Sequence, residues 1–251
     1  MKKLLGDAHD QGALSARSHA TLDVVDVGQQ IQAGLGVAID DITASEVVLV
    51  TLMPDDSGSI AAAHNAGAVR DGHNFVLDAL RCSKQSGEVL AHTRYLNGHV
   101  LFPYIALDHA VKMTPANYTP DQGTPLYDQT AVVLGTVIAK SQELAQAGIA
   151  VRTVTLIITD GADAGSRRVR PADIKSLVDD LLAQEHHIVA AMGISDGSTD
   201  FHQVFRAMGI PDRWILTPGN SASEIRRAFA VFSQSAIRTS QGAAQLGGFA
   251  N

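Results

Sequence analysis

The sequence predicts an α/β fold: a doubly wound, mostly parallel sheet with one antiparallel edge strand and helices on both faces. Two observations predict this class, and the chain length bounds the number of domains. Short β-branched apolar runs alternate along the chain with helical patterns, which is typical of a parallel sheet covered on both sides. The pair Asn97-Gly98 between two of these runs predicts a hairpin, and hence one antiparallel edge strand. The length of 251 residues is near the upper limit for a single hydrophobic core.

The predicted strands are short runs rich in Val, Ile, Leu and Thr. Residues 46–53 (Glu-Val-Val-Leu-Val-Thr-Leu-Met) and 151–159 are apolar almost throughout, as strands buried on both faces should be. Two other runs flank the Asn-Gly pair, and a last, very short one is expected at the far edge. The expected strands are 46–53, 89–96, 99–107, 151–159, 188–194 and 214–216.

Three helices are predicted from apolar spacing and from signals at their ends. Residues 129–147 form a largely buried helix that ends at Gly148. Pro171 opens a helix whose apolar residues recur at i, i+3, i+4, i+7 and i+8. The pattern Ser-Ala-Ser-Glu at 221–224 is a capping box, and it starts a helix that reaches to about Ala236.

These patterns divide the chain into an extension, a domain and a tail. The predicted boundaries are 1–43 for the N-terminal extension, 44–238 for the α/β domain and 239–251 for the C-terminal tail. In the extension, one apolar helix face is expected to dock on the domain through Val24, Val25, Val27, Ile31 and Leu35. The tail is rich in Gly, Ala and Gln, which predicts a flexible segment.

Composition limits the possible environments and partners. With 26 acidic and 19 basic residues, the net charge of -7 argues against non-specific nucleic-acid binding. The single cysteine, Cys82, allows no intrachain disulfide and suits a reducing cytoplasm; we expect it to be a small core residue. Polar residues interrupt the opening Met-Lys-Lys-Leu-Leu, so no signal peptide is expected. No run approaches the roughly 18 apolar residues of a membrane span. A cytoplasmic protein is therefore predicted.

Five polar residues from three distant segments form the candidate site. They are Asp55, Ser57, Ser59, Thr124 and Asp160. The first three directly follow the strand at 46–53, and Asp160 directly follows the strand at 151–159. The threonine lies in a polar loop before a helix. Ligands of open α/β sheets bind outside the carboxyl ends of the strands, so the three segments are expected to converge there.

Two carboxylates and three hydroxyls form an oxygen-rich site for a small divalent cation. Mg²⁺ prefers octahedral oxygen coordination and is usually held by one or two carboxylates together with water. Hydroxyls are neutral ligands, so two aspartates leave the ion electrophilic. Such a site favours one more carboxylate from outside the chain. The same residues taken singly are also typical of turns and helix caps after strands.

The three segments together resemble a known family. The run Asp-Asp-Ser-Gly-Ser at 55–59, with Thr124 in Gln-Gly-Thr-Pro-Leu and Asp160 in Ile-Thr-Asp-Gly, resembles the von Willebrand factor type A (vWA) domain, a Rossmann-like fold, and its metal ion-dependent adhesion site (MIDAS). The similarity covers about residues 44–238. All five site positions match in order, although Asp56 adds an acid to the run and Gln122 replaces a common glycine.

The resemblance implies a metal-dependent protein–protein interaction module. Ser57, Ser59 and Thr124 would bind Mg²⁺ (or Mn²⁺) through their hydroxyls, and Asp55 and Asp160 would contribute directly or through water. A protein partner would complete the shell with an Asp or Glu. The missing signal peptide favours the intracellular bacterial type, whose members often act as adaptors beside AAA+ ATPases or in stress-response systems. No enzyme activity, nucleic-acid partner or membrane partner is expected.

A metal-assisted hydrolase is the alternative function. A phosphoesterase would use Asp55, Asp56 and Asp160 around a catalytic ion. Among His and Glu residues, only His64 lies beside the motif segments, so a general base is lacking.

Other motifs in the sequence are weaker. Ser195 sits in a Gly-x-Ser-x-Gly pattern after a strand, but only His202 follows it, too close to be the late member of a hydrolase triad. We therefore predict a turn there. The Gly-Leu-Gly at 34–36 lacks a third glycine for a dinucleotide site. The histidine pair at 186–187 is expected to be solvated or half-buried, and the arginines at 167–170 to form a solvated loop near the site mouth.

Overall fold

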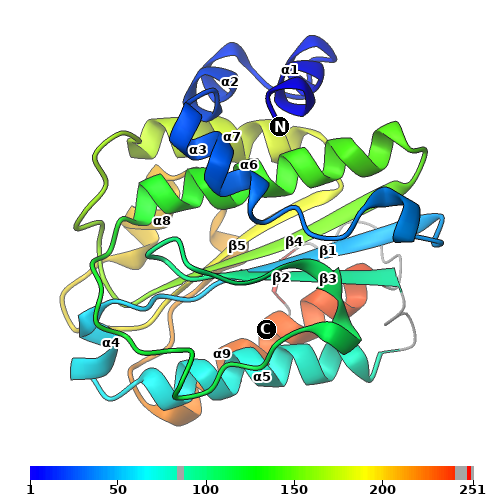
Figure 1. The fold of residues 1–251 in the computed structure, drawn as a ribbon. Helices are drawn as coiled ribbons and strands as arrows, with labels where there is room; N and C mark the ends of the chain where they lie inside the picture. The colour runs from blue at the N-terminus through cyan, green and yellow to red at the C-terminus, as the bar shows by residue number, and fades with distance from the viewer. Residues whose placement is uncertain (84–87, 241–247, 250–251) are drawn as a thin grey trace.

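The computed structural model describes residues 1–83, 88–240 and 248–249, and it confirms the predicted fold class. Within these residues six strands form one sheet in the order β3-β2-β1-β4-β5-β6 (Figure 1). All neighbouring pairs are parallel except β2 and β3, which form the predicted antiparallel edge. The strands are β1 (Glu46–Met53), β2 (Val89–Arg94), β3 (Val100–Ala106), β4 (Ala150–Thr159), β5 (His187–Gly193) and β6 (Ile215–Leu216).

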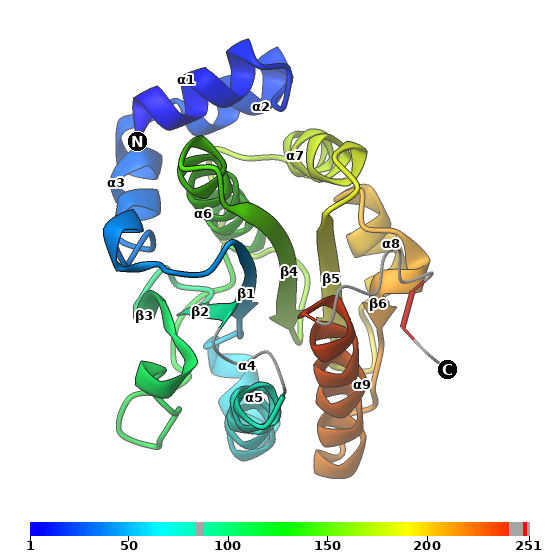
Figure 2. The ribbon, with the colours of Figure 1, turned by 90° about the vertical axis from the view of Figure 1, so that its right-hand side faces the viewer.

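Helices cover both faces of the sheet, and a third layer lies over one of them. Figure 2 shows α6 and α7 on one face and α5 and α9 on the other, while α1, α2 and α3 pack on the outside of α6 and α7. The helices are α1 (Lys2–Asp10), α2 (Ala16–Leu22), α3 (Val25–Gln32), α4 (Gly58–Ala62), α5 (Ala66–Arg81), α6 (Leu126–Gln146), α7 (Pro171–Ala183), α8 (Phe201–Ala207) and α9 (Ala222–Ser240). Short 3₁₀ turns are η1 (Ile39–Asp41), η3 (Leu107–His109) and η4 (Asp212–Trp214).

The predicted strands and helices are present with small shifts at their ends. Gly148, with a φ of +77°, follows α6, where a left-handed residue ends the helix at little steric cost. The hydroxyl of Ser221 accepts a hydrogen bond from the backbone N–H of Glu224, as the capping pattern predicts. The helix it starts runs on to Ser240, past the predicted end at Ala236. The extra turn continues the buried side of the helix, since Thr239 is only 6% exposed.

The helix α6 is buried around most of its circumference, including polar residues such as Lys140 and Gln142. One side faces β1 and β4, and the opposite side is covered by α1, α2 and α3. Lys140 Nζ donates to the carbonyl of Val37 at 2.6 Å and pairs with Glu143 at 2.7 Å, so its charge is compensated. The extension thus makes α6 a central helix between the sheet and the outer layer.

The N-terminal extension joins the main hydrophobic core. Leu22 and Ile31 are at most 1% exposed and belong to the same apolar cluster as the sheet. Ser15 attaches α2 to α7, because its backbone N–H and its hydroxyl both donate to the Asp180 carboxylate, at 2.8 and 2.9 Å. Two of the residues predicted for the docked face are instead exposed: Val24 by 37% and Val25 by 63%. They lie at the start of α3, where the helix turns its other face to α6.

Cys82 and five of the helices differ from the prediction. Cys82 is exposed at the end of α5 and is not a core residue, because the helix axis ends there at the surface. The helices α1, α2, α4, α5 and α8 were not predicted. Most of the predicted tail lies outside the described residues; of its last part, Phe249 packs edge-on against Trp214 with ring centroids 5.1 Å apart.

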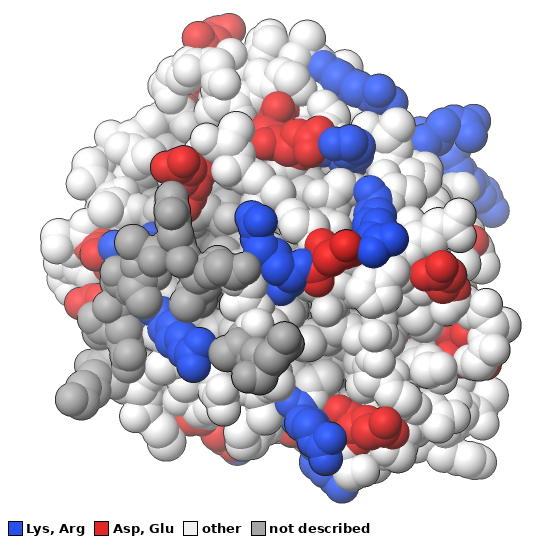
Figure 3. All heavy atoms as spheres, turned by 180° about the vertical axis from the view of Figure 1, so that it is seen from behind, with Lys and Arg blue, Asp and Glu red and all other residues white. Residues whose placement is uncertain are grey.

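Two surface properties bear on function. In the described ranges, no helix combines the length and apolar character that crossing a bilayer requires. The face behind Figure 1 carries Lys and Arg side chains interspersed with Asp and Glu (Figure 3). As far as described residues form this face, it therefore lacks the one-sign basic patch of a nucleic-acid binding surface.

Candidate metal centre

The site lies at the carboxyl ends of the two central strands. Met53 of β1 pairs with Ile157 of β4, so the loops that follow the two strands start side by side. Asp55 and Asp160 belong to these loops, as the sequence predicts. Between them they place two carboxylates at the edge of the sheet where ligands of this architecture bind.

Four of the five predicted residues are joined by hydrogen bonds. The hydroxyl of Ser59 donates to Asp160 Oδ1 at 2.6 Å, and that of Ser57 lies 3.5 Å from the same oxygen. The two serine hydroxyls are 2.9 Å apart. The two serines reach the same carboxylate because Gly58 between them begins α4 directly after the strand loop. Ser59 is exposed, so the cluster opens to solvent there.

Asp55 is the buried anchor of the cluster. Its side chain is 0% exposed and accepts hydrogen bonds from the Ser57 backbone at 2.7 Å and the Thr159 hydroxyl at 2.8 Å. The backbone N–H of Asp160 approaches the same carboxylate at 3.4 Å. The phenol of Tyr118 donates to the Asp55 carbonyl oxygen. Both its side chain and its backbone are therefore fixed in place.

Thr124 lies next to this cluster in a loop bonded to both of the other segments. Its carbonyl accepts the N–H of Ala164, in the loop that follows Asp160, at 2.9 Å. Two residues earlier, the Gln122 carbonyl accepts the N–H of Gly58 at 3.0 Å. Thr124 is 7% exposed, and within the described residues its hydroxyl has no hydrogen bond to the other four site residues. The backbone thus brings the threonine to the site without a direct side-chain contact.

Asp56 and Gln122, the two departures from the family pattern, hold loops together. Asp56 is 3% exposed and does not face solvent. Its carboxylate accepts the Asn97 N–H at 3.0 Å, and its carbonyl accepts the N–H groups of Asp121 and Gln122, both at 3.1 Å. Asp56 therefore links the site to the β2–β3 hairpin and to the threonine loop.

Three carboxyl groups in this small region have raised pKa values. Burial raises the pKa of Asp55, despite the hydrogen bonds that favour its charged form. Burial raises the pKa of Asp160 as well, and the neighbouring charge of Asp55 adds to the rise. For Asp56, burial raises the pKa to about 7. Over the described ranges, no Lys, Arg or His pairs with any of the three.

The donor set fits a hard divalent cation. Carboxylate and hydroxyl oxygens are the ligand types that Mg²⁺ takes, and a cation would supply the positive charge that the acidic cluster lacks. Among the residues the structure describes, no group of three or more His, Cys, Asp or Glu side chains has a metal-binding arrangement. Metal binding at this edge would thus depend on the hydroxyls of Ser57, Ser59 and Thr124 as much as on the two aspartates.

The weaker motifs form no second site in the described part of the chain. Ser195 is exposed in the turn after β5, and its hydroxyl accepts the Gly197 N–H at 3.3 Å. His202 instead lies 3.5 Å from Asp212. His187 is 4% exposed, not half-buried, because it begins the inner strand β5, where its Nδ1 meets the Thr153 hydroxyl at 2.8 Å.

Three residues that support the site were not predicted. They are Thr159, Tyr118 and Asn97, which contact Asp55 or Asp56. Thr159 could have been found, because a hydroxyl that ends a strand directly before Asp160 must lie near the neighbouring strand end. The other two act from loops whose path depends on the tertiary fold.

Comparisons with known proteins give structural matches only. No protein-family model matches the sequence, and neither does any curated protein. A crystal structure of the pilus adhesin SpaC from Lactobacillus rhamnosus GG, in an open conformation, aligns at TM-score 0.55 with 16% identity. The match covers 77% of this chain and 30% of SpaC. A second SpaC structure gives TM-score 0.56 with 14% identity over 77% of this chain and 31% of SpaC.

A smaller protein matches more weakly. The SpRpn10 VWA domain aligns at TM-score 0.47 with 8% identity, covering 72% of this chain and 92% of that domain. At such identities the likeness concerns the fold alone. The chain spans about a third of the SpaC chain it matches.

Proposed function

We propose that this chain, which has a vWA-like fold, is a metal-dependent protein–protein interaction module and not an enzyme. The proposed ligands of Mg²⁺ or Mn²⁺ are Asp55, Ser57, Ser59, Thr124 and Asp160. One observation carries the proposal: the hydroxyl of Ser59 donates to Asp160 at 2.6 Å across a separation of about a hundred residues, beside a buried Asp55. Buried carboxylates without a counter-charge are costly unless a cation pairs with them.

The bound ion would supply an electrophilic centre for a carboxylate from a partner protein. The hydroxyls of Ser57 and Ser59 are neutral ligands, so only the two aspartates would supply negative charge to a divalent ion. The ion would therefore stay electrophilic and could take one more oxygen ligand. Ser59 is exposed and marks the open side of the cluster. The side chain that completes the shell would be an Asp or Glu at the surface of the partner.

The nature of the partner is part of the proposal. SpaC is a pilus adhesin, so a structure that shares this fold belongs to a binding protein. For this chain, with one cysteine and an acidic composition, we propose a cytoplasmic adaptor whose partner is an AAA+ ATPase or a stress-response protein. The position of Asp56 supports binding over phosphoester hydrolysis, because its carboxylate is already used to hold the Asn97 backbone.

Affinity purification tests the proposal. Wild type and Ser57→Ala are compared in Mg²⁺ and in EDTA, and the bound proteins are identified by mass spectrometry. Ser57 precedes α4 without capping it through its side chain, so the substitution removes a ligand and leaves the helix intact. A partner present only with wild type and Mg²⁺ is the expected result.

Ser198→Ala is the matched control, because Ser198 is an exposed loop serine near the end of a neighbouring strand. It should retain the partner in Mg²⁺. An identical set of proteins in every sample would refute metal-dependent capture. Turnover of a phosphoester in Mg²⁺ that is lost in Asp160→Ala would establish the hydrolase alternative instead.

A further inference from the structure

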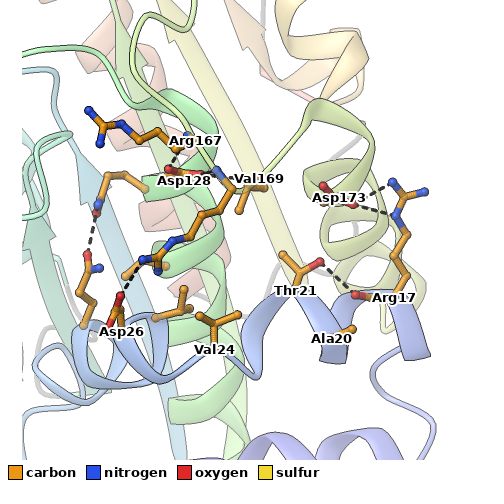
Figure 4. A pocket seen from close by; sticks show the side chains of 14 residues that line it. Arg17, Ala20, Thr21, Val24, Asp26, Asp128, Arg167, Val169 and Asp173 are labelled. Atoms are coloured by element: carbon orange, nitrogen blue, oxygen red, sulfur yellow. Dashed lines mark hydrogen bonds and ion pairs between the residues drawn. The ribbon is translucent and has the colours of Figure 1, made fainter.

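A pocket of about 490 Å³ lies between the N-terminal extension and the domain, and we call it the extension pocket (Figure 4). The helices α2 and α3 form one side. The first turns of α6 and α7 and the loop between β4 and α7 form the other. Its volume lies in the range of small-molecule sites. Its apolar lining comes from Ala20, Val24, Val27, Val132 and Val169.

Two exposed ion pairs border the pocket. Arg17 of α2 reaches Asp173 of α7 at 2.8 Å, and Arg168 of the loop reaches Asp26 of α3 at 2.7 Å. Both pairs bridge the extension and the domain, as Figure 4 shows for Arg17 and Asp173. Exposed pairs contribute little to stability, so either arginine can turn to a ligand at small cost.

Arg167 and Asp128 also line the pocket, but their side chains do not form an ion pair with each other. The Asp128 carboxylate accepts three backbone N–H groups, from Arg167 and Arg168 and, at 2.8 Å, from Val169. This carboxylate is therefore occupied by the loop backbone. In the described residues the guanidinium of Arg167 has no ion pair. The pocket thus carries three arginines and three aspartates, and among these arginines only Arg167 lacks an ion pair within the described residues.

A buried arginine is hydrogen-bonded to one residue of the pocket lining, Gln30. Arg94 is 1% exposed, and its guanidinium donates to two carbonyls, of Gln30 and of Gly98, while its Nε has no partner in the described structure. Within the same residues no carboxylate pairs with it. A buried guanidinium without an anion is costly, so this position would be stabilised by a negatively charged group.

Two glutamines connect the pocket with the surroundings of Arg94: Gln30 accepts its hydrogen bond, and the Gln129 amide lies near its other partner, Gly98. Gln30 and Gln129 both line the pocket, and Gln129 Nε2 donates to Gln30 Oε1 at 3.1 Å. Gln129 is 8% exposed, yet its Oε1 has no hydrogen-bond partner among the described groups. The lining therefore contains an unsatisfied acceptor, and Arg94, which is bonded to the backbone of the lining residue Gln30, holds an unsatisfied donor. The side chains of Gln30 and Gln129 are flexible amides, and changes of rotamer can move them apart.

We propose that the extension pocket binds a small organic carboxylate, whose charged group pairs with Arg94 between the separated amides of Gln30 and Gln129. The apolar part of the ligand packs against the valines of α3, α6 and the loop. Exposed arginines at the rim, including Arg167, draw the anion in. Burial lowers the pKa of Arg94 only to about 10, so the guanidinium stays charged at neutral pH. This site is separate from the metal centre and needs no metal.

Hexanoate is the probe, used with the full chain in EDTA so that metal capture of carboxylates cannot contribute. We expect a saturable rise in Tm and a binding isotherm by calorimetry. Hexanamide, which has the same apolar chain without the charge, should bind at least about tenfold more weakly, the factor that 1.4 kcal/mol gives. Arg94→Met should weaken hexanoate binding by a similar factor.

Ala20→Trp provides a variant that does not disturb the core. Ala20 is exposed on α2 and lines the pocket, so an indole there fills the cavity from outside and should abolish binding. Arg206→Ala is the control: it removes an exposed arginine of α8 that pairs with Asp212, and it should leave binding unchanged. Equal affinity for hexanoate in Ala20→Trp, equal binding of hexanamide, or no saturable binding would each overturn the proposal. If Arg94→Met does not fold, Ala20→Trp decides alone.

Discussion

At the scale of single residues, Asp160 combines two opposing environments. The hydroxyls of both serines approach its carboxylate, which favours the ionised form, while burial and the nearby Asp55 favour the protonated form. The net effect is a raised pKa, so ionising Asp160 in the folded state costs more than in the unfolded chain. Without a cation, the wild-type site is therefore a source of instability at neutral pH.

Asp160→Asn should raise the stability of the metal-free protein and abolish its response to Mg²⁺. The amide oxygen still accepts the serine hydroxyls, and the buried charge is removed, so in EDTA the variant should be more stable than wild type by about 1 kcal/mol. Mg²⁺ should raise the Tm of wild type and leave that of Asp160→Asn unchanged. Thermal unfolding with and without Mg²⁺ measures both effects.

Asp179→Asn is the control for this comparison. Asp179 is an exposed carboxylate that pairs with Lys175, remote in sequence from the motif segments. The response of this variant to Mg²⁺ should equal that of wild type. A Mg²⁺-dependent rise in Tm that persists in Asp160→Asn would contradict the proposed ligand set.

Because His73 is buried, the folded protein should lose stability in acid. This histidine is fully buried beside the Thr93 hydroxyl, and burial lowers its pKa to about 4 from 6.5. Between these two values the unfolded chain takes up a proton that the folded protein does not. The stabilising contribution is therefore complete above pH 6.5 and is lost as the pH falls toward 4, by up to about 3 kcal/mol.

Urea unfolding of wild type and His73→Gln at several pH values checks this prediction. Glutamine retains a polar group for Thr93 but does not titrate. The difference in the free energy of unfolding between wild type and variant should narrow as the pH falls from 6.5 to 4. A constant difference across this range would show that His73 does not remain neutral in the folded protein.

At the scale of elements, the helices α5 and α9 pack closely against each other. The ring of Phe229 in α9 lies where a side chain at Gly72 would be: a Cβ there would come within 2.0 Å of the ring. Phe229 is 0% exposed and cannot move into solvent. Glycine at this position therefore allows the two helices to pack closely on the lower face of the sheet in Figure 2.

Gly72→Ala should destabilise the protein by about 1–3 kcal/mol, because the added methyl group forces α5 and α9 apart. Gly67→Ala in the same helix is the matched control. There the nearest atom to a new Cβ is the end of Arg70, at 3.7 Å, so helix propensity alone should stabilise by about 0.5–1 kcal/mol. Urea unfolding of both variants measures the contrast. Equal effects would show that the Phe229 ring does not limit the contact.

At the scale of the whole molecule, the extension and the domain form one core. Ile31 of α3 is 0% exposed, and at Gly135 of α6 a Cβ would lie only 2.6 Å from its side chain. The predicted boundary at residue 43 therefore marks a change in the sequence pattern, while the hydrophobic core continues across it. In packing, the first three helices cover α6 and α7, and they also complete the extension pocket.

Ile31→Ala should therefore lower the stability of the entire chain by about 2–5 kcal/mol, in a single unfolding transition. Val25→Ala on the same helix, at a side chain 63% exposed, should change it by less than about 0.5 kcal/mol. Circular dichroism and tryptophan fluorescence follow the unfolding, since Trp214 lies near the far edge of the sheet. Two separate transitions would show that the extension folds as an independent unit.

The fold was predictable where the pattern is local. The runs 46–53 and 151–159 are strands because β-branched apolar residues suit a strand buried on both faces. The helix α5 was missed because polar and small residues, including Gly67 and Gly72, weaken its periodic pattern. Its helical form depends on packing against α9, which lies about 150 positions further along the chain.

The sequence by itself determined the fold class, the order of most elements and the five residues of the candidate metal centre, because strand periodicity and the positions after strand ends are local properties. Only the tertiary structure decided that Ser57 and Ser59 meet Asp160 and that Asp56 is buried. It also decided that the extension packs on α6 to leave a pocket beside Arg94. These relations depend on which distant surfaces exclude water together, and that depends on the packing of the whole chain.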